Sequence, residues 1–220
     1  MQISEFFPIW AQLTPAQQQS LQDCAIPKHI AQGTMLHSSK QDCLGLLLVE
    51  RGQLRVYILS PEGRQITLYR LLDREICLLS ASCIMRSISF DIQIEAEKDT
   101  TLRIIPANVY QHLLAQSAPL SSFTNEIMAS RFSDVMWLLE QVLWQRLDQR
   151  LANFLLNESV LEDSQELHLT HEVIGNHIGS PREVVTRMLR YFQSEGLVSL
   201  QRGKICLLDP AGLEQIRQAP

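Results

Sequence analysis

The residues with the clearest chemical meaning lie between positions 180 and 192. If this segment is a helix, its polar side chains occupy an arc of roughly 140° and its apolar side chains an arc of roughly 100°. The polar set is Arg182, Glu183, Thr186, Arg187 and Arg190, and the apolar set is Val185, Met188, Leu189 and Phe192. Arginine can donate two hydrogen bonds to guanine, and glutamate can accept one from the amino group of cytosine. The segment therefore predicts a helix that reads the major groove of DNA, although a helical hairpin with a solvated charged face fits the same pattern.

The residues before this helix predict a tight turn that positions it. A first helix ends at Gly179, because glycine readily adopts the left-handed conformation that closes many helices. We expect Ser180 to cap the second helix, with Pro181 at its first position. Glu183 then completes a Ser-x-x-Glu capping box.

A C-terminal module surrounds these two helices. A helix is expected over 146–157 and a short strand near Leu167 and Leu169, and a hairpin over 198–207 turns at residues 201–204. Helices followed by a two-stranded flap are the pattern of a winged helix. Residues 180–204 hold five basic and two acidic side chains, a local net charge of +3 within a chain of net charge -5. We expect Arg202 and Lys204, on the wing, to contact phosphate groups.

A long amphipathic stretch over 121–143, about 33 Å as a helix, precedes this module. It carries a stripe of apolar residues with heptad-like spacing, namely Met128, Phe132, Val135, Leu139 and Val142. A second apolar face comprises Ile127, Trp137, Leu138 and Leu143. One face can cover the helix's own domain while the other meets a partner helix, so the stripe predicts a symmetric dimer. Packing on its own domain alone is the alternative.

The first half of the chain predicts a small β-structure. From about residue 30 to 105 apolar and polar residues alternate, most clearly over 53–58 and 90–96, and residues 60–63 form a turn between two such runs. Short strands at this spacing indicate an antiparallel roll or barrel. The capping box of Thr14 and Gln17, with Pro15 at the first helical position, predicts a short helix over 14–22.

Composition limits the class of protein. The chain has 220 residues, 45% of them hydrophobic, which argues against intrinsic disorder and allows one large or two modest domains. Its longest apolar run, over 44–49, is too short to cross a bilayer, and the first residues show no basic region typical of a secretory signal. Five cysteines without a Cys-x-x-Cys pair suit a reducing compartment, so we expect a cytoplasmic protein whose thiols are mostly buried.

The segment over 180–187 resembles the helix-turn-helix of the Crp/Fnr superfamily of bacterial transcription regulators, in which a Ser-Arg-Glu-x-Val-x-Arg core opens the recognition helix. Order and lengths agree along nearly the whole chain. The resemblance implies an α+β fold with an N-terminal antiparallel β-roll sensor over 1–120, a dimerisation helix over 121–144 and a winged-helix DNA-binding domain over 145–220. It implies that Arg182, Glu183 and Arg187 face base edges. The full DNA-binding set that we predict is Thr170, His171, Ser180, Arg182, Glu183, Thr186, Arg187, Arg190, Arg202 and Lys204.

The chain departs from this family where the family binds cyclic AMP. The Gly-Glu-Leu element is reduced to Arg74-Glu75-Ile76, and the positions of the phosphate-binding Arg-Ser pair fall near Phe90 and Asp91. An aromatic ring and a carboxylate do not bind phosphate, so we predict that cyclic AMP is not the effector. Arg86-Ser87 allows a shifted alignment. Only Cys24 precedes the roll, so the cysteine cluster of the iron–sulfur branch is missing.

The segment over 75–83 takes the place of the family's effector-binding segment. We predict that it lines the effector pocket, with Glu75, Cys77, Ser80, Ser82 and Cys83 as the candidate residues. It resembles the segment that supplies an axial cysteine in the haem-containing branch, although the histidine of that branch is Leu79 here. Haem binding and thiol redox sensing therefore stay open, beside the interpretation of Cys77 and Cys83 as inert buried thiols.

Other classes of function have weaker support. A cupin-type metal site needs several histidines inside the roll, and we place only His37 there. Motifs of serine hydrolases and of nucleotide-hydrolysing loops are absent from the sequence, so we expect no enzyme activity. The expected partners are double-stranded DNA, a second copy of the chain, an unidentified small effector and RNA polymerase. A winged helix that binds only protein is the rival interpretation.

Overall fold

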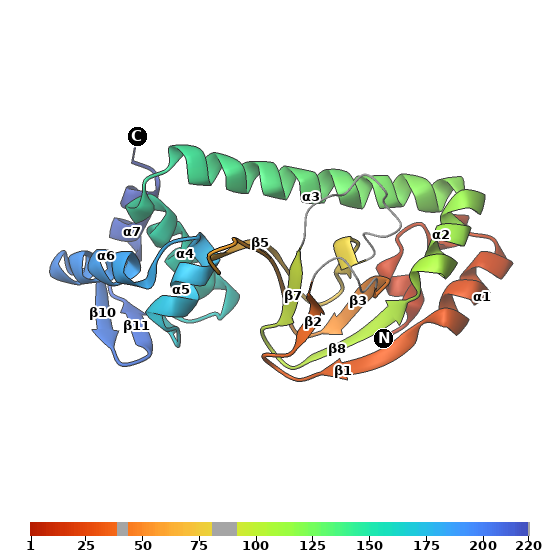
Figure 1. The fold of residues 1–220 in the computed structure, drawn as a ribbon, viewed down its shortest axis with the longest axis horizontal. Coiled ribbons are helices and arrows are strands. Elements are labelled where there is room, and N and C mark those ends of the chain that lie inside the picture. Colours follow the sequence, from red (N-terminus) through yellow and green to blue (C-terminus); the bar gives the residue numbers. More distant parts are fainter. Residues whose placement is uncertain (39–43, 81–91, 220) are drawn as a thin grey trace. The chain divides into compact units, whose positions relative to one another are not determined.

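The computed structural model describes residues 1–38, 44–80 and 92–219 (Figure 1). These residues form two compact units. The first contains Met1–Ile58 and Leu68–Val135, and the second contains Leu59–Thr67 and Met136–Pro220. Helices and antiparallel sheets occur together, so the predicted α+β class is confirmed.

The predicted β-roll of the first half consists of two four-stranded sheets, whose described strand pairs are antiparallel. The first sheet has the order β1 (Ile26–Ile30), β8 (Thr100–Ile105), β3 (Leu46–Arg51) and β6 (Ile76–Cys77). The second has the order β2 (Met35–Ser38), β7 (Gln93–Ala96), β4 (Leu54–Leu59) and β5 (Gln65–Leu71). The predicted strand over 90–96 is described only from Ile92 onward, because residues 81–91 lie outside the described part of the chain.

Strand β3 shows why alternation fails in the middle of the roll. Its residues Leu47 and Val49 pack into the apolar cluster that the second sheet shares, whereas Leu46 and Leu48 pack into a different cluster with the N-terminal helices. All four side chains are fully buried. A strand that is covered on both faces has no polar side, so its sequence is a continuous apolar run.

Helices cover the outer face of the first sheet (Figure 1). They are two short 3₁₀ helices, η1 (Ile3–Phe6) and η2 (Trp10–Gln12), followed by α1 (Pro15–Cys24) and α2 (Ala107–Gln116). The capping box predicted for α1 is confirmed, because the Gln17 backbone N–H donates to Thr14 Oγ1 at 3.3 Å and the Thr14 N–H donates to Gln17 Oε1 at 3.0 Å.

The long helix α3 (Ala118–Trp144) confirms the helix predicted over 121–143 and begins three residues earlier. The hydroxyl of Ser117 accepts a hydrogen bond from the backbone N–H of Leu120, which extends the helix toward its N-terminus. Early in α3, Leu120 and Thr124 are buried against the first unit. Farther along, Phe132 and Leu139 are 66% and 45% exposed, so an apolar stripe lies open to solvent.

The second unit contains the C-terminal helices and a three-stranded sheet of order β10–β11–β9. Its elements after α3 are α4 (Leu147–Leu161), β9 (Glu166–Leu167), α5 (His171–Ile178), α6 (Arg182–Ser194), β10 (Val198–Gln201), β11 (Lys204–Leu207) and α7 (Pro210–Arg217). Strands β10 and β11 are the predicted wing. Helix α7 was not predicted, although Asp209 caps it and Pro210 opens it, which is a start signal that the sequence displays.

One apolar cluster holds these elements together. Side chains from α4, α5, α6, the wing and α7 meet in it, and Leu151, Val185, Phe192 and Leu213 are fully buried. No helix within the described residues is long and apolar enough to span a bilayer.

Candidate nucleic-acid interface

A glycine turn connects α5 to α6. Helix α5 ends at Ile178, and Gly179 follows in the left-handed conformation with φ 69°, as predicted. The backbone N–H groups of Gly179 and Ser180 both donate to the carbonyl oxygen of Gly175, the second of them at 2.9 Å. Ser180 therefore belongs to the closing turn of α5.

The predicted cap of α6 is wrong by one residue. Helix α6 begins at Arg182 with Pro181 as its N-cap, and no side chain caps it. Ser180 cannot act as the cap because its backbone already closes α5 on Gly175. The predicted capping box with Glu183 is therefore not formed, and the Glu183 side chain is exposed at the start of α6.

The two faces of α6 are those predicted from the sequence. Val185, Leu189 and Phe192 are fully buried in the core of the second unit, and Met188 packs against that core. The opposite face exposes Arg182, Glu183, Arg187 and Arg190, with Thr186 partly exposed. A helix that is anchored by one face and charged on the other can enter a major groove without losing its core contacts.

His171, at the start of α5, is connected to this face through Thr186. The Thr186 hydroxyl donates its single proton to the carbonyl oxygen of Arg182 at 2.8 Å, and His171 Nδ1 lies 2.9 Å from the same hydroxyl oxygen. Nδ1 is therefore the donor in this pair. Burial, together with the charges of Arg182 and Arg190, lowers the pKa of His171, so the ring is neutral at pH 7 and its Nε2 is an acceptor.

The wing carries two basic side chains, one exposed to solvent and one in an ion pair. Arg202 lies in the exposed turn between β10 and β11, whereas Lys204 Nζ is 2.5 Å from a carboxylate oxygen of Glu166 on β9. The hydrogen bond from Lys204 lowers the pKa of Glu166, and His168 lies 3.3 Å from the same carboxylate. Lys204 must therefore share its charge between Glu166 and any phosphate that it contacts.

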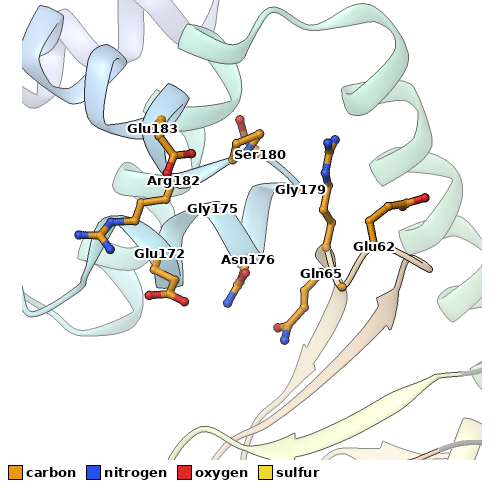
Figure 2. A pocket seen from close by; sticks show the side chains of 12 residues that line it. Glu62, Gln65, Glu172, Gly175, Asn176, Gly179, Ser180, Arg182 and Glu183 are labelled. Atoms are coloured by element: carbon orange, nitrogen blue, oxygen red, sulfur yellow. The ribbon is translucent and has the colours of Figure 1, made fainter.

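A pocket of about 380 Å³ lies beside the turn within the second unit. Figure 2 shows Glu172 and Asn176 projecting from the same side of α5, with Arg182 and Glu183 at the start of α6. Glu62, Gln65 and neighbouring residues of the 62–65 turn complete the lining. The polar side chains at the start of α5 and of α6 therefore line the same pocket.

The structure also places part of the predicted effector segment. Cys77 is fully buried, and burial raises the pKa of its thiol. The Ser80 hydroxyl lies 2.6 Å from the carbonyl oxygen of Gly45 and 2.8 Å from that of Cys77, and Glu75 forms an ion pair of 3.0 Å with Arg131 on α3. Ser82 and Cys83 lie outside the described residues, as do the positions from 86 to 91 discussed for phosphate binding.

Arg131 was not among the residues predicted from the sequence, and its guanidinium carbon lies 4.7 Å from the centre of the Tyr69 ring. The available signal was a lone arginine within the apolar half of the long helix, with Asp134 three residues later at 3.1 Å. The count of strand histidines was also too low, because His29 lies in β1. Among the described residues no group of three or more His, Cys, Asp or Glu side chains is placed to hold a metal ion.

A β-roll, a long helix and a winged helix-turn-helix together define a class of DNA-binding regulatory proteins. Residues 149–216 match the family model of the Crp-like helix-turn-helix domain. A crystal structure from Eubacterium rectale, of a protein assigned to the Crp/Fnr family of transcriptional regulators, is 58% identical, with a TM-score of 0.95 over 97% of this chain and 99% of that chain. The chain belongs to the Crp/Fnr family of transcriptional regulators, as its resemblance indicated.

Two curated relatives are more distant. The transcriptional regulatory protein btr of Bordetella pertussis is 28% identical over 76% of this chain and 71% of its own length. The transcriptional regulator SdrP of Thermus thermophilus is 30% identical over 57% of this chain and 61% of its own length. These relatives are transcriptional regulators rather than enzymes.

We predict that Gly175→Ala destabilises the second unit, although alanine normally favours a helix interior by about 1 kcal/mol over glycine. A Cβ atom at this position would lie 2.5 Å from the carbonyl oxygen of Ser180, so the turn would have to open. We expect a loss of about 1–3 kcal/mol in the free energy of unfolding, measured in urea. Gln193→Ala, at an exposed position of α6, is the control and should change little. A Gly175→Ala variant as stable as the wild type would contradict the close approach.

Proposed function

We propose that this regulator binds a near-palindromic operator as a homodimer, with α6 in the major groove of each half-site, under the control of an effector that acts on the β-roll. The observation that carries the proposal is the exposure of Arg182, Glu183 and Arg187 on the face of α6 opposite its buried apolar side. These side chains have the donors and acceptors that discriminate base pairs in the major groove.

The remaining cations of the interface suit the DNA backbone. Arg190 lies two turns along α6 from Glu183, and Arg202 lies at the tip of the wing, so both can reach phosphates while α6 contacts bases. Thr170 and His171 begin α5, where backbone N–H groups of the first helical turn favour an anion. Ser180 contributes through its place in the turn and Thr186 through its contact with His171.

The homodimer is proposed through the apolar stripe of α3. At 100° per residue its members fall within an arc of roughly 80°. Phe132, Leu139 and Val142 are exposed, and Met128 and Val135 are partly buried. A two-fold pairing of this stripe would cover the exposed side chains and bring two recognition helices to half-sites about 34 Å apart.

The effector is proposed to act at the segment over 75–83, close to where Arg131 of α3 pairs with Glu75. The buried protonated thiol of Cys77 supports a structural role for that cysteine, because a thiolate is needed for metal ligation or oxidation. An effector must bind one arrangement of the protein more tightly than another in order to shift its activity. RNA polymerase is the further partner that we propose, because the relatives of this chain regulate transcription.

We expect Arg182→Ala to cost about 1–3 kcal/mol at one base position of the operator and to relax specificity there. Arg202→Ala should weaken binding to all sequences alike. It should also reduce the slope of the logarithm of the binding constant against the logarithm of the salt concentration by about one. Selection from random duplexes, followed by titrations at several salt concentrations, measures both effects. If Arg182→Ala kept the affinity and the base preference of the wild type, α6 would not be the reading helix. A winged helix that binds only protein would select no duplex at all.

We predict that the affinity for the operator rises as pH falls from 8 to 6. The lowered pKa keeps His171 neutral at pH 7, and a phosphate near its Nε2 favours the protonated ring, so DNA binding takes up a proton. A rise of one unit in the pKa on binding corresponds to about a tenfold change in affinity. His171→Gln should flatten this dependence, whereas His168→Gln, whose side chain is 74% exposed, should retain it. Equal pH profiles for the wild type and His171→Gln would remove His171 from the interface.

We predict that Leu139→Asp dissociates the dimer and weakens operator binding in parallel, because the substitution buries an unpaired charge at the seam. Ser133→Asp introduces the same charge at an exposed position of α3, roughly 140° from the centre of the stripe, and should stay dimeric. Light scattering at micromolar concentration measures the oligomeric state. A monomeric wild type, or a dimeric Leu139→Asp variant, would exclude this interface.

A further inference from the structure

A second cavity of the second unit lies on the side of α3 that faces α4 and α5. Its volume is about 140 Å³, and the C-terminal part of α3 contributes Trp137 and Val142 to it. Helix α4 contributes Arg150 and Phe154, and the end of α5 contributes Ile178. At 100° per residue the lining positions of α3 are centred roughly 110° from the centre of the apolar stripe. The cavity and the proposed dimer seam are thus centred on different faces of the helix and meet at Val142.

Arg150 gives this cavity an uncompensated positive charge. One terminal nitrogen of its guanidinium donates to the carbonyl oxygen of Ile178 at 3.1 Å, at the C-terminus of α5. Its Nε atom is buried without a hydrogen-bond partner. Burial lowers the pKa of Arg150, and none of the carboxylates that the structure describes pairs with it. A half-buried cation without a counter-ion favours the entry of an anion.

The walls of the cavity limit the shape of that anion. The volume is close to the roughly 150 Å³ of an apolar protein cavity that holds benzene. Trp137 and Phe154 present aromatic surface, and Phe154 is itself stacked on His177 with ring centres 5.2 Å apart. Asn153 and Asn157 follow Arg150 at helical spacing on α4 and add amide groups to the same lining. One planar ring fits, and Gln141 of α3 and His177 of α5 add further polar groups to the lining.

We propose that this cavity binds a small aromatic carboxylate, with the ring between Trp137 and Phe154 and the carboxylate on Arg150. A guanidinium donates charge-assisted hydrogen bonds to a carboxylate, and among the described residues only one terminal nitrogen of Arg150 has a partner, the carbonyl oxygen of Ile178. We assign the other terminal nitrogen as the donor to the carboxylate. A single guanidinium and a cavity for one ring favour a monoanion over a nucleotide. The site does not overlap the DNA-reading face of α6, and its occupation does not depend on DNA binding.

Benzoate and benzyl alcohol are the probes that test this site, because they share a ring and differ in charge. The full chain carries three tryptophans, so a Trp10→Phe and Trp144→Phe background leaves Trp137 as the only tryptophan fluorophore. We expect saturable quenching of Trp137 by benzoate, and binding of benzyl alcohol at least tenfold weaker. No saturable binding of benzoate, or equal binding of both probes, would overturn the proposal.

Two variants locate the bound benzoate, and calorimetry or ligand-observed NMR measures its affinity. Arg150→Gln should weaken benzoate at least tenfold and leave benzyl alcohol unchanged. Because Arg150 also contacts α5, Asn157→Phe provides an independent test by filling the cavity from its exposed rim without removing core atoms. Val160→Phe is the matched control, since Val160 is 80% exposed on the same helix and does not line the cavity. Benzoate binding that survives Asn157→Phe, or is lost equally in Val160→Phe, would place the anion elsewhere.

Discussion

The carbonyl oxygen of Gly175 and the turn that closes on it set the position of α6. Two backbone N–H groups after α5 converge on this oxygen, and the carbonyl of Ser180 returns so close to Gly175 that no side chain fits there. This contact fixes where α6 starts and so which of its side chains face outward. Val185, Leu189 and Phe192 then anchor the helix in the core, and the charged face follows from helical geometry.

The charges around α6 depend on individual neighbouring side chains rather than on the net charge of the chain. The chain is acidic overall, yet the exposed face of α6 carries three arginines, and Lys204 forms an ion pair with Glu166. Burial, followed by the charges of Arg182 and Arg190, lowers the pKa of His171. A phosphate competes with Glu166 for Lys204, and it favours the protonated form of His171. DNA binding is therefore expected to depend on both salt and pH.

Apolar side chains are buried on both faces of β3 in the first unit, whereas part of the apolar surface of α3 is exposed. Strand β3 is buried on both faces, which gives the roll a rigid centre, and Arg131 of α3 reaches Glu75 and Tyr69 on the roll. The rest of α3 has an exposed apolar stripe and a second face that lines a cavity together with Arg150 of α4. Arg150 pairs with none of the described carboxylates, unlike Glu75 in the proposed effector segment, which pairs with Arg131.

The sequence by itself determined the features that depend on local chemistry and on periodicity. Thr14 and Gln17 located α1, the 3.6-residue period located the two faces of α6 and the stripe of α3, and Gly179 located the turn. Two local features were nevertheless predicted wrongly or not at all. The backbone N–H of Ser180 donates to Gly175 and places Ser180 in the closing turn of α5, and α7 was not predicted although Asp209 and Pro210 are a start signal. Tertiary structure decided the features that depend on residues far apart in the chain. The ion pair between Glu75 and Arg131 has no local signal, because only folding brings these two side chains into reach of one another. Nor does the sequence show that Arg150 pairs with none of the described carboxylates.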